Sequence, residues 1–409
     1  QVETSELCGL ADFNESHIGY RTYIKDALRL WLNKGVDGFR VDTVKHMPLW
    51  FWQEFVSDMV FHRPDFYIFG EWFQGGCYDA LSVQFMNKSG MGMLDFGLQR
   101  GLEDCLARGA GQGFELIENV FGKDSLFDDC RHLVTFLDNH DMPRFMSAGA
   151  SPARVDMGLA LILTCRGTPC IYYGTEQYLH NDTNGGADPY NRPMMENWES
   201  GTPAFRLVKK LAAVRRESKA VQSGSHRKKY LSPDVYAYTR VYRDNCCLAA
   251  FNRGAETSID LENIELPDGV YKDVLSDRAV SVKAGRISGL KLERDSSFVL
   301  SYCAPAREKT GLEISFVLNG FSTAYGERVK VTGNCPELGN WDLSKAFPLE
   351  YINENMWLGH LPIKESAGKA IAYKFIVERD NAGVLYENRP AHVRLIPAAG
   401  SMEQQHRWS

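Results

Sequence analysis

The sequence contains 409 residues, of which 44% are hydrophobic and 24% are charged, and its formal net charge is −6. This length accommodates two or three domains. The negative charge argues against nucleic acid or an anionic membrane as the main partner, because such binding needs a strongly basic patch. No run of about 18 apolar residues is present to predict a transmembrane helix.

The first 220 residues alternate short apolar strands with amphipathic helices. We expect Gly35 to cap the first helix and Pro48 to open the second. The predicted helices cover residues 22–35, 48–60, 152–165 and 204–217. The predicted strands cover residues 36–42, 66–71, 93–96, 133–138 and 169–174. Strands and helices in this alternation predict parallel βα units.

Acidic residues stand at or just beyond the carboxyl ends of three predicted strands, at Asp42, Glu71 and Asp141. In a βα barrel these ends carry the active site. The fold class expected is therefore α/β, with strands of a (β/α)8 TIM barrel. The five predicted strands are three short of a closed barrel, so we expect the chain to start partway into it, with its C-terminal portion present.

From about residue 223 the pattern changes to short alternating strands and turns, which predicts an all-β module. A stretch at 303–311 has the composition of a linker, and a second all-β module is expected from 312 to about 396. The last residues, 401–409, are predicted to form a loose tail.

The ten cysteines leave two alternatives open. Cys165 and Cys170 flank a predicted helix-to-strand junction and could form a disulfide, but buried free thiols explain them equally well. No cysteine spacing is typical of zinc sites. Cysteine usage does not settle the compartment.

Three acids, each at a different strand end, are compatible with glycoside hydrolysis. One carboxyl group protonates the leaving oxygen, and a second attacks the sugar carbon or activates water. A third can stabilise the charge that develops on the sugar ring. A single acid at a strand end commonly only caps a loop, so the neighbouring residues decide the interpretation.

Five segments resemble those of glycoside hydrolase family 13, the α-amylase family. They are GFRVDTVKH at 38–46, FGEWF at 69–73, FLDNHD at 136–141, LADFN at 10–14 and GTPCIYYGTE at 167–176. The resemblance implies that Asp42 is the nucleophile, Glu71 the general acid and then base, and Asp141 the stabiliser of the oxocarbenium-like state.

The same resemblance implies further contacts with the sugar chain. Arg40 would keep the nucleophile ionised, since a nearby cation lowers a carboxyl pKa, and His140 would bind sugar beside Asp141. The other implied substrate-binding residues are Lys45, His46 and Phe73 on the acceptor side, and Asp188 and Arg192 on the opposite side.

The resemblance also implies a calcium ion as cofactor. Asp12 matches a calcium ligand of the family, and the backbone carbonyl of His46 would supply a second oxygen. Calcium takes six to eight oxygen ligands, so the remaining ones must come from elsewhere.

The terminal module resembles a family-20 starch-binding module. Trp341, Lys374 and Tyr386 match its first sugar site, and Trp357 matches part of a second. The family usually carries Trp where this chain has Tyr386, and Ala391 replaces the usual Asn, which weakens the match. The implied domains are a partial (β/α)8 catalytic domain with the end of domain B at 1–220, a β-sandwich C domain at 221–305, and the starch-binding module at 311–401.

Some motif details are similar to the cyclodextrin glycosyltransferase branch, among them DTVKHMP and the aromatic Phe73. Two features favour hydrolysis instead: Cys8 replaces the aromatic residue around which the glucan wraps in transferases, and the linker leaves no room for their extra immunoglobulin-like domain. We predict a retaining endo-acting α-amylase that converts starch to linear maltooligosaccharides. The alternatives are a cyclodextrin glycosyltransferase or other α-glucan transglycosylase, and a non-catalytic starch-binding protein.

The partners expected from these assignments are starch and maltooligosaccharides, together with an N-terminal fragment of the same enzyme that completes the barrel. Nucleic acid and membranes are not expected partners. A polymeric substrate and a starch-binding module predict an extracellular, secreted protein.

Overall fold

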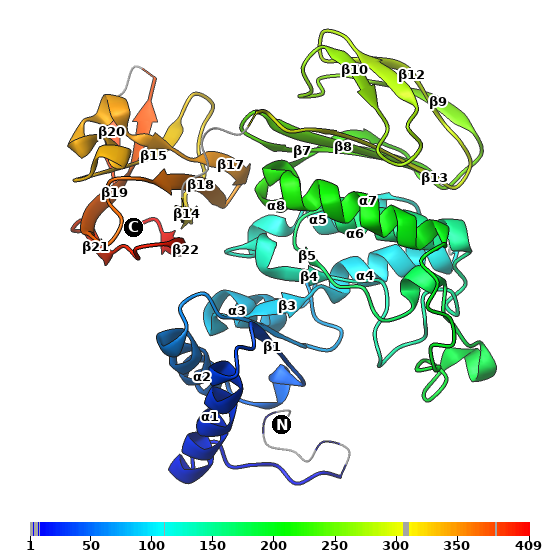
Figure 1. Ribbon diagram of the computed structural model, residues 1–409, viewed down its shortest axis with the longest axis horizontal. Coiled ribbons are helices and arrows are strands. Elements are labelled where there is room, and N and C mark those ends of the chain that lie inside the picture. The colour runs from blue at the N-terminus through cyan, green and yellow to red at the C-terminus, as the bar shows by residue number, and fades with distance from the viewer. Residues whose placement is uncertain (1–2, 4–6, 8, 110, 306–310, 381–382) are drawn as a thin grey trace. The chain divides into compact units, whose positions relative to one another are not determined.

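The computed structural model describes residues 3, 7, 9–109, 111–305, 311–380 and 383–409 (Figure 1). It divides into two compact units, residues 1–303 and 304–409, which are described separately below. Within the described residues, no helix combines the length and the apolar composition needed to cross a membrane.

The first unit begins with a parallel sheet in which consecutive strands are neighbours. Its order is β1-β2-β3-β4-β5, and every pair is parallel. The strands are β1 (Gly38–Val41), β2 (Tyr67–Gly70), β3 (Gly92–Leu94), β4 (Leu133–Thr135) and β5 (Thr168–Pro169). All five predicted strands are therefore present and parallel, although each is shorter than predicted. An acidic residue directly follows each of the first three strands: Asp42 after β1, Glu71 after β2 and Asp95 after β3.

Helices precede, connect and follow these strands. They are α1 (Ile18–Asn33), α2 (Leu49–His62), α3 (Ala80–Ser89), α4 (Phe96–Leu102), α5 (Glu115–Phe121), α6 (Pro152–Thr164), α7 (Pro203–Glu217) and α8 (Lys219–Ser223). Short helical turns are η1 (Val44–His46), η2 (Glu103–Ala107), η3 (Asp124–Leu126), η4 (Cys130–His132), η5 (Thr175–Gln177) and η6 (Thr183–Gly186). The four predicted helices are α1, α2, α6 and α7. Gly35 follows the α1 cap with φ +89, and Pro48 is the N-cap of α2.

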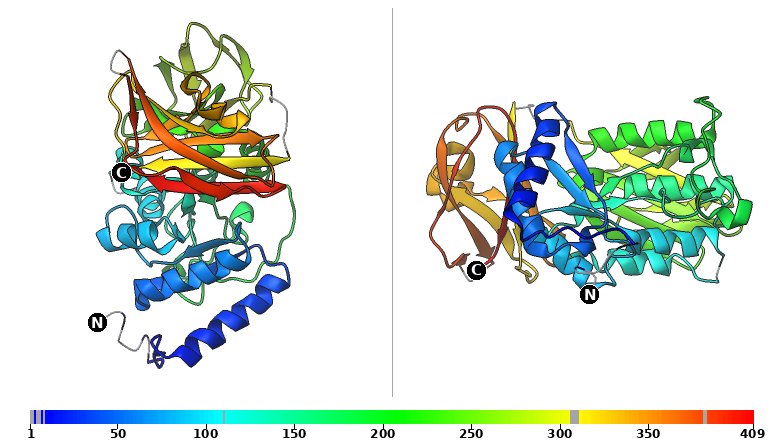
Figure 2. Two further views of the ribbon diagram at one scale, coloured as in Figure 1. Left: turned by 90° about the vertical axis from the view of Figure 1, so that its left-hand side faces the viewer. Right: turned by 90° about the horizontal axis from the view of Figure 1, so that it is seen from below.

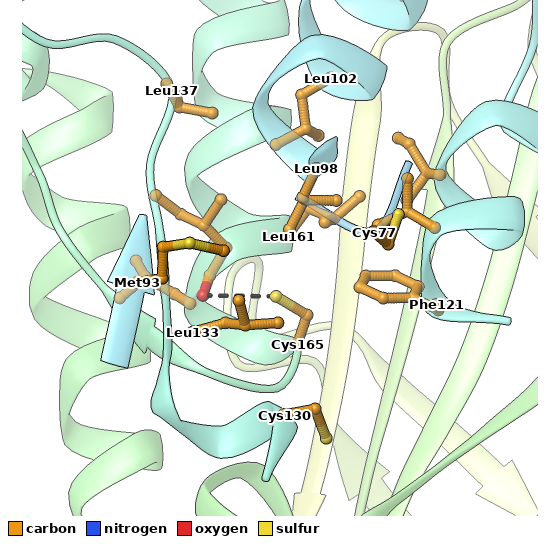
Figure 3. Packing of buried hydrophobic residues seen from close by; sticks show 14 of the residues in the cluster. Cys77, Met93, Leu98, Leu102, Phe121, Cys130, Leu133, Leu137, Leu161 and Cys165 are labelled. Carbon is orange, nitrogen blue, oxygen red and sulfur yellow. Dashed lines mark hydrogen bonds between the residues drawn. The ribbon is translucent and has the colours of Figure 1, made fainter. Parts of the chain in front are cut away.

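The core of this unit lies between the parallel sheet and its helices. Figure 3 shows Met93, Leu133 and Leu161 among the buried side chains of this core. Helix α6 contributes almost its whole surface, since residues 157–164 are all buried. A helix that is apolar on every face lies inside a protein, so α6 is the central support between the sheet and the elements that follow it.

An antiparallel sheet completes the first unit. Its order is β13-β8-β7-β6, and two smaller pairs, β10-β11 and β12-β9, lie beside it. The strands are β6 (Ser225–Leu231), β7 (Val235–Tyr242), β8 (Asn245–Asn252), β9 (Thr257–Leu261), β10 (Gly269–Lys272), β11 (Ala279–Val282), β12 (Ile287–Leu292) and β13 (Ser296–Tyr302). Tyr236 and Tyr238 pack into the helical core, whereas Ala237 belongs to a second core on the other face. Helix α6 contacts β8 and β13, and helix α8 contacts β7 and β8. In Figure 2 the green helices of the first unit lie next to its yellow-green strands.

The second unit is all-β. One sheet has the order β17-β18-β14-β22, and the other joins β16, β15, β19 and β20 with β21. The strands are β14 (Leu312–Asn319), β15 (Arg328–Gly333), β16 (Phe347–Pro348), β17 (Glu350–Asn353), β18 (Met356–Ile363), β19 (Ala370–Arg379), β20 (Gly383–Tyr386), β21 (His392–Leu395) and β22 (Gly400–Arg407), with short turns η7 (Pro336–Trp341) and η8 (Leu343–Lys345).

The prediction of a loose C-terminal tail is wrong. Strand β22 pairs in parallel with β14 along its whole length, from Leu312 opposite Gly400 to Asn319 opposite Arg407. The strand is polar because its side chains alternate between exposed and half-buried positions. The ring of Trp408 also lies 4.6 Å from that of Phe321, which fixes the end of the chain.

The disulfide alternative for Cys165 and Cys170 is not realised. Both cysteines are free in the structure, Cys165 buried and Cys170 exposed. The thiol of Cys165 instead points toward the carbonyl of Ile162, with an S···O distance of 3.8 Å (Figure 3).

Candidate active site

Asp42 and Glu71 are placed by the ends of two adjacent strands. The amide of Glu71 donates to the carbonyl of Val41 at 2.8 Å, which continues the ladder one residue beyond β1 and β2. The amide of Val44 donates to the carbonyl of Glu71 at 3.1 Å. Thr43, with φ 49, turns the chain sharply between them. The two acids are therefore held by backbone bonds at the same edge of the sheet.

Arg40 bridges the two carboxylates. Its Nη1 lies 2.7 Å from Asp42 Oδ1, and its Nη2 lies 3.0 Å from Glu71 Oε1. The second contact is an ion pair without hydrogen-bond alignment, because Glu71 Oε1 has no hydrogen-bond partner. The acids differ in exposure: the Asp42 side chain is 62% exposed and that of Glu71 only 4%. One guanidinium thus serves a solvated acid and a buried one.

The environments push the two pKa values apart. Burial raises the pKa of Glu71 to about 7, and the hydrogen bond with Asp42 acts in the same direction. Burial also acts to raise the pKa of Asp42, but the hydrogen bond with Glu71 and the charge of Arg40 outweigh it and hold the pKa below its ordinary value. A low and a raised pKa on adjacent carboxyls is the arrangement that assigns one as a base or nucleophile and the other as an acid.

Asp141 lies in the loop after β4 within a polar cluster. Its amide donates to Asn139 Oδ1 at 2.8 Å, and its Oδ2 lies 3.1 Å from His140 Nε2. Arg192 approaches Asp141 Oδ1 at 3.4 Å and Asp188 Oδ1 at 3.3 Å. The charge of Asp141 contributes to the raised pKa of Glu71, and the charge of His140 to the lowered pKa of Asp42. The structure therefore brings Asp141, His140, Asp188 and Arg192 together near the two strand-end acids.

Sequence reasoning missed Asn191. This residue is buried, and its Nδ2 donates to the carbonyl of His140 at 2.7 Å. Arg192 Nε donates to the same carbonyl at 2.8 Å. The segment that contains Asn191 resembled a family loop only through Asp188 and Arg192, so the Asn191 side chain gave no separate signal. The hydrogen bond from Asn191 holds the main chain immediately before Asp141.

A buried ion pair supports this loop from behind. Arg144 Nε lies 3.2 Å from Asp138 Oδ2, and both side chains are buried. Thr175 donates its hydroxyl to Asp138 Oδ1 at 3.0 Å. The Arg144 guanidinium also lies 4.4 Å from the centre of the Tyr172 ring, whose pKa burial raises to about 12. Asp138 and Arg144 lie within or beside the FLDNHD segment, but their pairing could not be read from the chain.

The predicted acceptor-side residues come from two different elements. Lys45 Nζ lies 5.9 Å from the centre of the Phe73 ring, which is 37% exposed. Phe73 also packs edge-on against Phe96 at 5.4 Å. His46 ends η1, directly after Lys45. A half-exposed ring beside a lysine is a surface on which a sugar face can stack.

The predicted calcium ligands lie in separate segments. Asp12 is exposed in the stretch before α1, and His46 ends η1. Glu15 adds a carboxylate oxygen that is shielded from water and has no hydrogen-bond partner. Burial is the main cause of the raised pKa of Tyr20, and the charges of Glu15 and Asp12 raise it further. Both acids therefore lie near the same phenol. These groups are oxygen donors of the kind calcium prefers, but fewer than its usual six.

In the second unit, two predicted starch contacts lie on one face of a sheet. Tyr386 stands opposite Ile376, two residues from Lys374 on β19, so Tyr386 and Lys374 point to the same side. Tyr386 is 47% exposed and Trp341 is 44% exposed. Trp357 differs: it is 6% exposed and packs into the core of the unit. The exposed ring there is its cross-strand neighbour Tyr351, 5.4 Å away and 42% exposed.

Comparisons with known protein families assign both units. Residues 5–219 match the family described as alpha amylase, catalytic domain, and residues 311–406 match the starch binding domain. The two matches follow one another in the chain and leave residues 220–310, with the antiparallel sheet, between them.

Individual relatives carry two kinds of name. A cyclomaltodextrin glucanotransferase of Klebsiella oxytoca is 31% identical over 89% of this chain and 61% of its own length. An alpha-amylase of Niallia circulans is 38% identical over 66% of this chain and 51% of its own length. The crystal structure of CldA, a cyclomaltodextrin glucanotransferase with a three-domain ABC distribution, matches with a TM-score of 0.71 and 38% identity over 74% of this chain and 64% of its own.

The chain thus spans less than two thirds of the length of these relatives. The parallel strands and the two all-β parts correspond to the C-terminal portion of the α/β barrel and the β domains of its structural neighbours. The family match covers more than half of the chain and contains all three strand-end acids. This chain belongs to the α-amylase family, glycoside hydrolase family 13, and carries a starch-binding domain near its C-terminus.

Proposed function

We propose that this protein is a retaining, endo-acting enzyme that cleaves α-1,4-glucosidic bonds of starch and releases linear maltooligosaccharides. The observation that carries the proposal is the Arg40 bridge between an exposed, ionised Asp42 and a buried Glu71 with its pKa at about 7. A bond-breaking step needs one carboxylate and one carboxylic acid at the same pH. At neutral pH this pair supplies both.

The chemistry proceeds in two displacements. Asp42 attacks the anomeric carbon while Glu71 gives its proton to the leaving glycosidic oxygen, and a covalent glycosyl ester on Asp42 results. Glu71, now ionised, takes a proton from water, and this water attacks the anomeric carbon of the glycosyl ester from the face vacated by the leaving sugar. The ester breaks, Asp42 is released as the carboxylate, and Glu71 is protonated again. Asp141 stabilises the positive charge that develops on the ring in both steps.

Substrates with different leaving groups distinguish the roles of Asp42 and Glu71. Glu71→Gln removes the proton donor, so turnover of starch is expected to fall by orders of magnitude. Fluoride leaves with little protonation, so the attack of Asp42 on a glycosyl fluoride, measured as fluoride release, should survive in this variant. Asp42→Asn should lose both reactions. Equal losses on starch and fluoride in Glu71→Gln would contradict the acid role of Glu71.

Transfer to a second sugar is the other candidate function. The stacking surface formed by Lys45 and Phe73 favours it, because a bound sugar hydroxyl can replace water in the second displacement. Neither of the two features that favour hydrolysis excludes transfer. Cys8 lies outside the described residues, and CldA is named a cyclomaltodextrin glucanotransferase although it has only three domains. Chromatography of products from soluble starch distinguishes the outcomes: linear reducing oligosaccharides indicate hydrolysis, and cyclic non-reducing ones indicate transfer.

A polypeptide that completes the barrel is part of the proposal. In the described residues β1 pairs on one side only, with β2. Helix α1 exposes Tyr23, Leu30 and Trp31, which are 73%, 55% and 52% exposed. An open strand edge beside exposed apolar side chains is a surface on which further parallel strands would pair. A preparation that cleaves starch should contain those strands, and full activity of these 409 residues alone would contradict this part.

The starch-binding unit and a calcium ion complete the proposed enzyme. Tyr386, Lys374 and Trp341 would hold a glucan chain by stacking and hydrogen bonds, independently of the three acids. Asp12, Glu15 and the carbonyl of His46 would contribute oxygens to calcium, whose effect would be structural. A polymeric substrate that cannot enter a cell supports secretion. Equal thermal stability with calcium and with a chelator would overturn the calcium assignment.

A further inference from the structure

A buried arginine outside the active site has no carboxylate in direct contact, although the charge of Asp124 acts on it. Arg240 lies in the middle of β7 and is only 2% exposed. Among the described residues, no carboxylate lies within 4.0 Å of its guanidinium, and its Nε has no hydrogen-bond acceptor. Arginine does not lose its proton in proteins. A buried, unpaired guanidinium is costly, so this position needs an explanation.

A second buried arginine lies nearby. Arg240 stands opposite His226 in the sheet register, and the His226 ring lies 4.7 Å from that of Phe121. The guanidinium of Arg166 lies 5.3 Å from the centre of the same Phe121 ring. Arg166 Nη2, like Arg240 Nε, is buried without an acceptor. The two unused donor atoms therefore belong to one cluster between the helices and the antiparallel sheet.

The acids of this cluster are already engaged. Arg166 Nη1 lies 2.6 Å from Asp95 and its Nε lies 2.8 Å from Asp124. A third cation, Arg215, donates to the carbonyls of Leu163, Cys165 and Gly167 at the end of α6. Three guanidiniums thus face two carboxylates.

Neighbouring groups do not supply the missing negative charge. Burial raises the pKa of Cys130 to about 12 and that of Cys165 to about 11, so both stay neutral thiols near pH 7. Figure 3 shows these two cysteines in the same buried cluster as Phe121. Glu118 is bound by His226, at 3.2 Å, and by the hydroxyl of Tyr236, at 2.6 Å, with Lys228 at 3.8 Å. Burial lowers the pKa of His226, so this imidazole adds no positive charge to the cluster near pH 7.

We propose that a small monovalent anion, chloride in a saline medium, binds between Arg240 and Arg166. Both unused atoms are hydrogen-bond donors with positive charge, which selects an anion over a cation. The aromatic rings of Phe121 and Tyr238 line the region, and Tyr238 is fixed by a 2.7 Å hydrogen bond with Thr164. An apolar lining with few donors suits a weakly hydrated halide better than phosphate. The ion would join the antiparallel sheet to the helices, at a place distinct from Asp42 and Glu71.

The test on the unaltered protein compares thermal unfolding in sodium chloride and in sodium gluconate at equal ionic strength. A ligand that binds only the folded state raises Tm in a saturable way. The expected rise is about 2–4 °C with chloride. Crystals soaked in bromide should show an anomalous peak in contact with Arg240 and Arg166. Equal Tm values, or a water molecule at that position with no bromide peak, would overturn the proposal.

Variants separate this ion from a general salt effect. Arg240→Met removes the charge at similar volume and should abolish the difference between chloride and gluconate, whatever its effect on baseline stability. Arg286→Met is the control, because Arg286 is exposed and pairs with Glu262 on the surface. This control should keep the chloride effect unchanged. If Arg240→Met does not fold, the bromide peak in the unaltered protein decides the question alone.

Discussion

Arg40 lies 3.0 Å from Glu71, yet the pKa of Glu71 is raised to about 7. A nearby cation lowers a carboxyl pKa, so burial outweighs it at this residue. At Asp42, which is largely exposed, the same cation helps to keep the pKa low. One arginine therefore acts on two carboxyl groups, and their different burial separates their protonation states.

The first prediction concerns pH. Glu71 must be protonated to act as the acid, so kcat/KM should fall as pH rises through about 7. Asp42 must be ionised, so kcat/KM should fall in acid as pH approaches its lowered pKa. Arg40→Gln removes a charge that lowers both pKa values, and both limbs of the profile should move to higher pH. Unmoved limbs in this variant would show that Arg40 does not set these pKa values.

The second prediction concerns Asn191 as a positioning residue. Asn191→Ala removes the buried hydrogen bond to the carbonyl of His140. Loss of such a bond costs about 1–3 kcal/mol, and kcat/KM should fall about 10- to 100-fold because Asp141 is no longer held in place. The Tm should fall by a few degrees because the lost bond is buried, whereas the two pH limbs should change little. The control, Asn197→Ala, alters an exposed residue six positions later and should retain activity; a matching loss there would point to general damage to the loop.

The third prediction concerns the fate of the covalent intermediate. Phe73→Ala removes the exposed ring beside Lys45, so acceptor sugars should bind less well. The ratio of transfer to hydrolysis products should fall, while total cleavage of soluble starch changes less. Phe61→Ala alters a ring that is 83% exposed on α2 and should leave the ratio unchanged. An unchanged ratio in Phe73→Ala would remove the structural support for transfer.

The fourth prediction concerns binding to granular starch, measured by sedimentation in an Asp42→Asn background. Trp341→Ala removes an exposed ring, and a stacking contact worth about 0.5–1.5 kcal/mol implies binding weaker by roughly two- to tenfold. Leu395→Ala, at a position that is 70% exposed in the same unit, is the control. Since Trp357 is buried, Tyr351→Ala tests the exposed ring beside it without cutting into the core. Full binding by Trp341→Ala would exclude its predicted role.

Local patterns predicted most of the barrel strands and the longest helices, because apolar runs and caps are local features. Helix α3 was missed although Asp79 caps its start and Gly90 its end in the left-handed region. The strand β22 was missed because a polar edge strand has no continuous apolar face. Its partner, β14, lies almost ninety residues earlier, and such a pairing has no local signal.

The residues of the candidate site also divide into those with a local sequence signal and those that only the folded chain brings together. Asp42, Glu71 and Asp141 stand out because each follows an apolar strand within a recognisable segment. Asn191 lies about fifty residues after His140, and only the folded chain brings its amide to that carbonyl. Trp357 was placed at a sugar site from its match alone, but nearly every residue of β18 is buried on both faces of its sheet.

The most direct measurement is mass spectrometry of the protein after reaction with a fluorinated maltooligosaccharide fluoride, which slows release of the covalent sugar. The account predicts one added glycosyl group, located on the peptide that contains Asp42, with the label absent in Asp42→Asn and still formed in Glu71→Gln. A label on another residue, or complete turnover without any covalent adduct, would contradict a double displacement through Asp42.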